Sequence, residues 1–323
     1  MKASALNPQL RSVFRFAPNP PIGRPWRIRL VRRMLAALPE AKLPDGVTRE
    51  RFDFSAGGGV RVFTPAGGGT GAALLFIHGG GMVIGNAAQE DARLAGIAQD
   101  LGIVTVSVEH RLAPEHRFPA HLDDCFEAWQ WVQQHAADRG IDPERVAVGG
   151  QSAGGGLAAS LAQRIRDELP VQPAAQWLFC PMLDDRTAAD RSLDALGHFL
   201  WNNRSNRIGW SAYLGKHPGR QDLPPYASPA RRTDLSGLPP AWIGAGDIEL
   251  FFAEDKAYAA ALESAGVETT FEAVAGAPHA FESVVPNAPV AREYMRRALD
   301  WLADRLGVNA SRQDTGDHRG AAG

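Results

Sequence analysis

Three groups of residues have the types and spacing that acyl-transfer chemistry requires, and each follows an expected strand. The first is Gly150-Gln151-Ser152-Ala153-Gly154, which matches the pattern G-x-S-x-G between an expected strand at 145–148 and an expected helix at 153–168. In that context the pattern produces a tight turn that exposes the serine hydroxyl at a helix N-terminus. Ser152 is therefore the candidate nucleophile.

The second group is the run His78-Gly79-Gly80-Gly81, directly after an expected strand at 72–77. Glycines let backbone N–H groups approach a substrate, and such groups stabilise the oxyanion of a tetrahedral intermediate. A phosphate-binding loop is disfavoured, because the spacing G-x-x-x-x-G-K-[ST] is absent and G-x-G-x-x-G lacks its later acidic residue. We expect His78 to hold the loop by hydrogen bonding rather than to act as a catalyst.

The third group supplies an acid and a base. His279 lies on a Gly/Pro-containing loop after the last expected strand, and Asp247 and Glu249 follow the strand expected at 241–244. A carboxylate at either position could orient the imidazole and stabilise its cation. The chain order serine, acid, histidine is that of α/β-hydrolases.

These motifs resemble those of the hormone-sensitive-lipase family of esterases, which has the α/β-hydrolase fold. The resemblance covers about residues 72–305 and includes EHRLAPEHRFPAHLDD (109–124), DPERVAVGG (142–150), YASPARRTDLSGLPPAWI (226–243) and GAPHAFE (276–282). It implies that Ser152 is the nucleophile and His279 the base. It further implies that Gly80, Gly81 and Ala153 form the oxyanion hole.

The chain departs from the family pattern at two positions. Gln151 stands where the family usually has Asp or Thr, so we expect a changed pH profile or acyl preference. The position that matches the family's acid is Glu249, which lies 30 residues before His279. We therefore favour Glu249 as the acid and keep Asp247 as its rival.

Short apolar runs alternate with helical patterns from about residue 50, which is typical of a parallel sheet covered on both faces. Expected strands are 51–55, 60–64, 72–77, 103–109, 145–148, 175–179, 241–244 and 268–274, and expected helices lie near 87–99, 119–137, 153–168, 253–265 and 289–306. The first two strands are expected to form an antiparallel hairpin. The predicted architecture is an α/β-hydrolase fold with a mostly parallel eight-stranded sheet and a helical cap.

The chain is expected to divide into core and cap. The predicted parts are an N-terminal part of the cap (1–45), a first part of the core (46–183), a cap insertion (184–228), a second part of the core (229–307) and a disordered tail (308–323). The insertion is rich in aromatic residues but lacks a strand–helix unit, and a long insertion of this kind is more often a lid than a disordered loop.

Residues 24–39 predict an amphipathic helix, because Trp26, Leu30, Met34 and Leu38 recur at a spacing of four. We expect its apolar side to pack against the protein and its arginine-rich side to face solvent. The alternative is that this helix contacts anionic lipid, as in a lipase that docks on a membrane surface.

Composition limits the other classes of function. The net charge is −2, which argues against nucleic-acid binding, and the two cysteines exclude a disulfide framework. No metal or cofactor is expected. No apolar run is long enough to span a bilayer and no secretory signal is evident, so we expect a cytoplasmic protein without stable membrane insertion.

The sequence therefore predicts a serine carboxylesterase, a carboxylic ester hydrolase acting on small ester substrates of short to medium acyl chain length through an acyl-enzyme. One alternative is a ligand-binding, receptor-like member of the same fold without catalysis. Another is a related amide or lactone hydrolase or deacetylase. Members of the family often dimerise, so the resemblance leaves a homodimer open.

Overall fold

A computed structural model describes residues 1–309, and within them eight strands form one sheet in the order β1-β2-β4-β3-β5-β6-β7-β8. The strands are β1 (Val47–Asp53), β2 (Gly59–Pro65), β3 (Ala73–Ile77), β4 (Val104–Glu109), β5 (Val146–Gln151), β6 (Gln176–Phe179), β7 (Ala241–Gly246) and β8 (Thr269–Val274). β2 pairs antiparallel with both β1 and β4, and all other neighbours are parallel. The predicted α/β-hydrolase architecture and the opening hairpin are confirmed.

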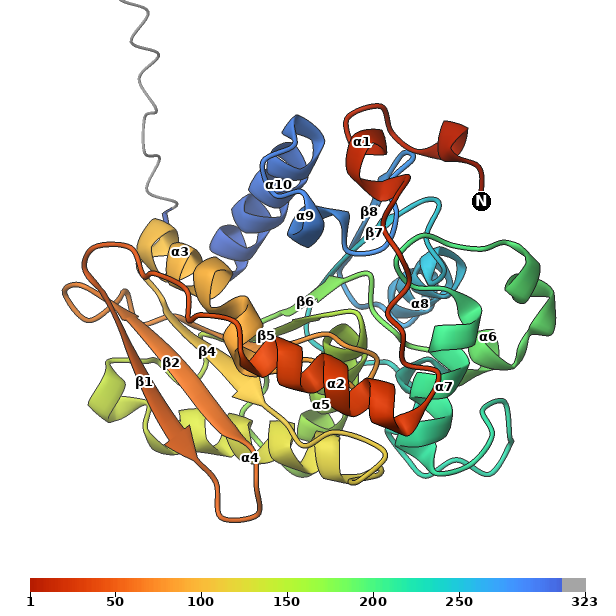
Figure 1. Ribbon diagram of the computed structural model, residues 1–323. Helices are drawn as coiled ribbons and strands as arrows, with labels where there is room; N and C mark the ends of the chain where they lie inside the picture. The colour runs from red at the N-terminus through yellow and green to blue at the C-terminus, as the bar shows by residue number, and fades with distance from the viewer. Residues whose placement is uncertain (310–323) are drawn as a thin grey trace, which may run out of the picture.

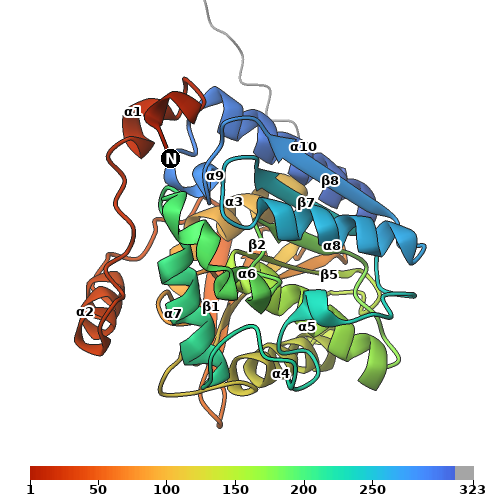
Figure 2. The same cartoon turned by 90° about the vertical axis from the view of Figure 1, so that its right-hand side faces the viewer.

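Helices cover both faces of the sheet, as the two views in Figures 1 and 2 show. The helices are α1 (Arg11–Phe14), α2 (Pro25–Ala36), α3 (Asp91–Leu101), α4 (Ala120–Gln134), α5 (Ala153–Glu168), α6 (Asp185–Ala189), α7 (Asn203–Leu214), α8 (Phe252–Ser264), α9 (Phe281–Val284) and α10 (Pro289–Leu306). The five core helices expected from the sequence are α3, α4, α5, α8 and α10.

The two-residue period of the strands separates the core into two layers. In β3, Leu75 and Ile77 pack in the cluster that contains residues of α4, α5 and α8, whereas Leu74 and Phe76 pack in the cluster of α3 and α10. Side chains alternate across a strand, so an uninterrupted apolar run fills both layers at once. The loops after the carboxyl ends of β3, β5, β7 and β8 therefore remain free to carry polar groups at one edge of the sheet.

The segment 184–228 contains α6 and α7 and is held to the start of the chain. The amino group of Met1 donates to the Gly197 carbonyl oxygen at 2.9 Å, and Asn19 Nδ2 donates to the His198 carbonyl oxygen at 3.3 Å. The two segments expected to form the cap therefore contact each other, although they are far apart in the sequence. The expected tail at 308–323 lies, from residue 310 on, outside the described residues.

Helix α2 forms where it is predicted, but the predicted orientation of its faces is wrong. The side chains expected to pack inward are between 49% and 63% exposed: Trp26, Leu30, Met34 and Leu38. The inward side carries Ile28, which is buried, and Arg32, which donates to the backbone oxygens of Val83 at 2.7 Å and Ala113 at 2.6 Å. The physical reason is that a guanidinium satisfies several backbone acceptors at once, which the apolar stripe cannot do.

Candidate active site

Ser152 lies in the turn between β5 and α5, with a backbone φ of +57°. This conformation is strained for a residue with a side chain, and it is held by the Ser152 N–H, which donates to the Phe179 carbonyl oxygen at 2.8 Å. A Cβ atom added at Gly150 would collide with the backbone of Gly154, and one added at Gly154 would collide with the Ile77 carbonyl oxygen. The two glycines of the motif are therefore required by the close packing of the turn.

A continuous chain of hydrogen bonds joins the three sequence candidates. Ser152 Oγ lies 2.9 Å from His279 Nε2, and His279 Nδ1 lies 2.9 Å from Glu249 Oε2. A carboxylate can only accept, so Nδ1 carries the proton and Nε2 is left to accept from the serine hydroxyl. All three residues are buried, with exposed fractions of 4–6%. This arrangement allows the imidazole to remove the hydroxyl proton.

The structure separates the two acid candidates. Glu249 contacts the imidazole, whereas Asp247 is exposed and its Oδ1 accepts from the Gly276 N–H at 2.7 Å. Asp247 therefore braces the loop that carries His279 and has no contact with the ring itself. Glu249 can reach the His279 ring, and Asp247 can reach the loop that carries this ring, because the loops after β7 and β8 are neighbours at one edge of the sheet.

A further carboxyl group lies beside Glu249. Asp255, at the start of α8, is fully buried. Burial and then the charge of Glu249 raise the pKa of Asp255 well above its usual range. Glu249 is the carboxyl group in contact with His279, and Asp255 lies next to Glu249. Sequence reasoning missed Asp255, because an acidic residue inside a helical pattern reads as solvent-exposed.

The glycine loop after β3 packs against the nucleophile turn. Gly80 and Gly81 have φ values of +126° and +60°, which side-chain-bearing residues rarely adopt. A Cβ atom at Gly81 would collide with the ring of Trp201, which comes from the segment 184–228. The third candidate of this group, Ala153, is the first residue of α5, where N–H groups have no partner within the helix. The loop thus lies against the nucleophile turn, because a Cβ atom at Gly79 would lie 3.4 Å from Ser152 Cβ, and Trp201 lies against Gly81.

Three buried histidines pack together beside the glycine loop. The rings of His78 and His110 stack with centroids 4.2 Å apart, and His121 lies 5.6 Å from His110. Burial lowers the pKa of His78 to about 4 and those of His110 and His121 to about 3. They are therefore neutral at physiological pH. His78 Nδ1 contacts the Gly79 carbonyl oxygen at 2.8 Å, in keeping with the structural role expected for it.

A cavity of about 820 Å³ borders the site, and its lining includes Gly80, Gln151, Glu282 and Met295. Gln151 Nε2 donates to Glu282 Oε1 at 2.5 Å and to Ser283 Oγ at 2.6 Å. Burial raises the pKa of Glu282. The residue before the nucleophile is thus tied to the loop that follows His279, a contact that sequence reasoning missed because it joins positions 131 residues apart.

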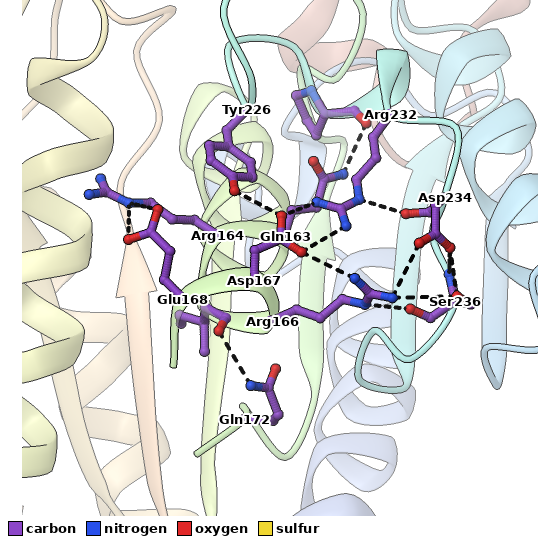
Figure 3. Close-up of polar contacts among 12 residues, drawn as sticks. Gln163, Arg164, Arg166, Asp167, Glu168, Gln172, Tyr226, Arg232, Asp234 and Ser236 are labelled. Atoms are coloured by element: carbon purple, nitrogen blue, oxygen red, sulfur yellow. Dashed lines mark hydrogen bonds and ion pairs between the residues drawn. The ribbon is translucent and has the colours of Figure 1, made fainter. Parts of the chain in front are cut away.

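A second cavity of about 640 Å³ lies beside the C-terminal half of α5, away from this site. Its charged groups pair with one another: Arg232 Nη2 donates to Asp167 Oδ1 at 2.9 Å, and the Tyr226 hydroxyl donates to Asp167 Oδ2 at 2.8 Å (Figure 3). The Arg232 guanidinium holds the pKa of Asp167 well below its usual range. We interpret this network as a structural junction between α5 and the segment around residues 223–236.

Residues 1–309 contain no group of three or more His, Cys, Asp or Glu side chains arranged to hold a metal ion. In the same residues, no helix has the length and apolar character needed to cross a membrane.

Comparisons with known proteins agree with this geometry. A family model described as alpha/beta hydrolase fold matches residues 74–283. The chain is 37% identical over 229 residues to the carboxylic ester hydrolase LipN of Mycobacterium tuberculosis, a match that covers 68% of this chain and 60% of LipN. It is 34% identical over 239 residues to the carboxylesterase NlhH of the same species, covering 72% of this chain and 73% of that protein.

Among solved structures, a bacterial heroin esterase superposes with a TM-score of 0.83 at 34% identity, covering 95% of this chain and 99% of that one. The chain belongs to the alpha/beta hydrolase fold family. The resemblance to hormone-sensitive-lipase-type esterases is confirmed. The relatives are ester hydrolases, which confirms the enzyme class predicted from the sequence.

Proposed function

We propose that the protein is a serine carboxylesterase that hydrolyses short- to medium-chain acyl esters through a Ser152–His279–Glu249 triad. The observation that carries the proposal is the pair of 2.9 Å contacts from Ser152 Oγ to His279 Nε2 and from His279 Nδ1 to Glu249 Oε2. Glu249 is the proposed acid because it is the carboxylate in contact with the imidazole, whereas Asp247 braces the adjoining loop.

In the acylation step, His279 Nε2 takes the proton from Ser152 as Oγ attacks the ester carbonyl carbon. Glu249 stabilises the imidazolium that forms. Backbone N–H groups of Gly80, Gly81 and Ala153 donate to the oxyanion. His279 then gives its proton to the leaving alkoxide, the carbon–oxygen bond of the ester breaks and the alcohol departs.

In the deacylation step, water attacks the acyl-Ser152 ester while His279 takes a proton from it. The second tetrahedral intermediate collapses, His279 returns the proton to Ser152 and the carboxylic acid leaves. The chain's own side chains and backbone supply every group that these steps need, so the proposed reaction uses no cofactor or metal.

The proposed acyl range rests on the cavity beside Gly80 and Gln151. Its volume of about 820 Å³ is ample for a small ester, and Leu200, Val284 and Met295 contribute apolar surface to its lining. We propose that residues 1–45 and 184–228 form a cap that covers this cavity. The position of Trp201 supports the assignment of residues 184–228 to the cap. Its ring lies against Gly81, and its centroid is 6.5 Å from that of the His279 ring.

We also propose a cytoplasmic protein whose partners are small-molecule esters rather than nucleic acid. The near-neutral net charge of −2 supports this, because nucleic-acid binding usually requires a strongly basic surface.

The test is hydrolysis of p-nitrophenyl esters from acetate to laurate by the wild type and by Ser152→Ala. We expect saturable hydrolysis that is fastest on the shorter chains and falls by at least about 10³-fold in Ser152→Ala. Equal rates for the two proteins would refute the nucleophile. Saturable ligand binding without turnover of any ester would favour the receptor-like alternative, and turnover of amides or lactones alone would favour a related hydrolase.

A further inference from the structure

The exposed apolar side chains of this protein are concentrated at the start of the chain. In the part of the chain that the structure describes, nine large apolar side chains are exposed, and seven of them fall within the first 38 residues: Met1, Val13, Phe16, Trp26, Leu30, Met34 and Leu38. Scattered single apolar residues are normal on a protein surface, but a contiguous group marks an interaction site.

Helix α2 presents Trp26, Leu30 and Met34 outward because its opposite side is anchored. Ile28 is 5% exposed, and Arg32 is tied to the Val83 and Ala113 carbonyl oxygens and to Glu115 Oε2 at 3.0 Å. At 100° per residue, Trp26 and Leu30 project from the side of the helix opposite Ile28. Figure 2 shows α2 at the periphery of the molecule, away from the sheet.

The charge around this apolar stripe has one sign. Residues 1–39 contain eight Lys and Arg and no Asp or Glu, so the rest of the chain carries a formal charge of −10. Within α2, Arg27, Arg29 and Arg33 are exposed and flank the stripe. An apolar stripe bordered by arginines is complementary to an anionic lipid surface, where the apolar side chains enter the acyl boundary and the arginines meet headgroup phosphates.

We propose that α2 docks the protein reversibly onto an anionic lipid surface. The helix itself borders the site described above, because Leu35, on the same side of α2 as Ile28, lines the cavity that contains Gly80. A docked protein would thus hold this cavity close to the lipid. Docking is independent of the hydrolytic chemistry, since none of the outward side chains contacts the triad.

The experiment measures binding of the full chain to vesicles by co-sedimentation. We expect binding to vesicles of phosphatidylcholine and phosphatidylglycerol (in a ratio of about 7:3) that is at least about tenfold stronger than binding to phosphatidylcholine alone, and that weakens as salt rises. Leu30→Ser/Met34→Ser should lower the affinity at least about tenfold. Ala37→Ser, which adds a hydroxyl at the C-cap of the same helix without removing a large apolar group, should leave the affinity unchanged.

A charge-reversal variant tests the electrostatic contribution to lipid binding independently. Arg33→Glu removes one attraction and adds one repulsion, each worth about fivefold near a charged surface, so binding should fall about 25-fold. Lys256→Glu, on the distant helix α8, makes the same change in net charge and should have little effect. Far-UV circular dichroism should be the same in all these variants, which shows that they are folded, and vesicle-free hydrolysis of p-nitrophenyl acetate by the wild type reports the esterase activity independently of docking.

Three results would overturn the proposal: no vesicle binding, equal binding to both vesicle compositions, or equal loss in Arg33→Glu and Lys256→Glu. Self-association that is lost in Leu30→Ser/Met34→Ser, measured by analytical ultracentrifugation, would identify α2 as a contact between two copies instead. None of these results bears on the proposed esterase function, which the vesicle-free assay measures separately.

Discussion

The assignment of the triad acid can be tested by one pair of isosteric substitutions. Glu249→Gln keeps the size of the side chain and an oxygen that can accept from His279 Nδ1, but it removes the negative charge. Both side chains are buried and in contact at 2.9 Å, so the imidazolium formed during catalysis would lack its counter-ion in a site that excludes water. Loss of one partner of a buried ion pair costs about 3–5 kcal/mol. Since 1.36 kcal/mol is tenfold in rate, kcat should fall by about 10²–10⁴-fold.

The matched control is Asp247→Asn. Asp247 is exposed and its contact is to the Gly276 N–H, which an amide oxygen can still accept. Its kcat should change by no more than about twofold, as for an ordinary surface substitution. The assay is steady-state hydrolysis of p-nitrophenyl acetate at saturating substrate, with circular dichroism to show that both variants fold. A larger loss of kcat in Asp247→Asn than in Glu249→Gln would refute the reasoning.

Three further predictions concern the surroundings of the triad. Gly81→Ala forces a Cβ against Trp201 at a positive φ and should displace the proposed oxyanion donor at this position. Steady-state kinetics should then show kcat about 10²-fold lower with little change in KM, and an unchanged kcat would exclude Gly81 from the oxyanion hole. Burial lowers the pKa of His78 from 6.5 to about 4, so the folded state binds this proton more weakly than the unfolded state, and the free energy of unfolding loses about 1.4 kcal/mol per pH unit as pH falls from 6.5 to 4. Urea titrations at several pH values should find that contribution missing in His78→Gln, and identical slopes would contradict it. Gln151→Glu sets a second carboxylate against buried Glu282 and should cost about 3 kcal/mol of stability at pH 8 but less at pH 5, where protonation relieves the repulsion; a Tm loss independent of pH would speak against this.

The sequence alone predicts the fold and the positions of Ser152 and His279 because the constraints there are local. A serine in a tight strand-to-helix turn needs glycine on both sides, since Cβ atoms at Gly150 and Gly154 would collide with neighbouring backbone. The buried strands likewise appear as uninterrupted apolar runs, because each must fill two layers of the core. Such requirements act over a few residues, so they leave a pattern that can be read without the structure.

Other features depend on contacts between distant segments. Asp247 and Glu249 are two residues apart on one loop, and only the position of His279 on the neighbouring loop distinguishes them. The tie between Gln151 and Glu282 joins positions 131 residues apart and leaves no local pattern. Sequence motifs could nominate candidates at these positions but could not pair them.

Helix α2 also shows which features the sequence determines and which depend on tertiary contacts. The spacing of its apolar residues determined that a helix with an apolar stripe would form, and that helix is present. Which side of it packs against the protein was decided by tertiary structure, because the backbone acceptors at Val83 and Ala113 are filled by Arg32. Periodicity describes a helix relative to its own axis, whereas the choice of the buried side depends on what the rest of the chain offers it.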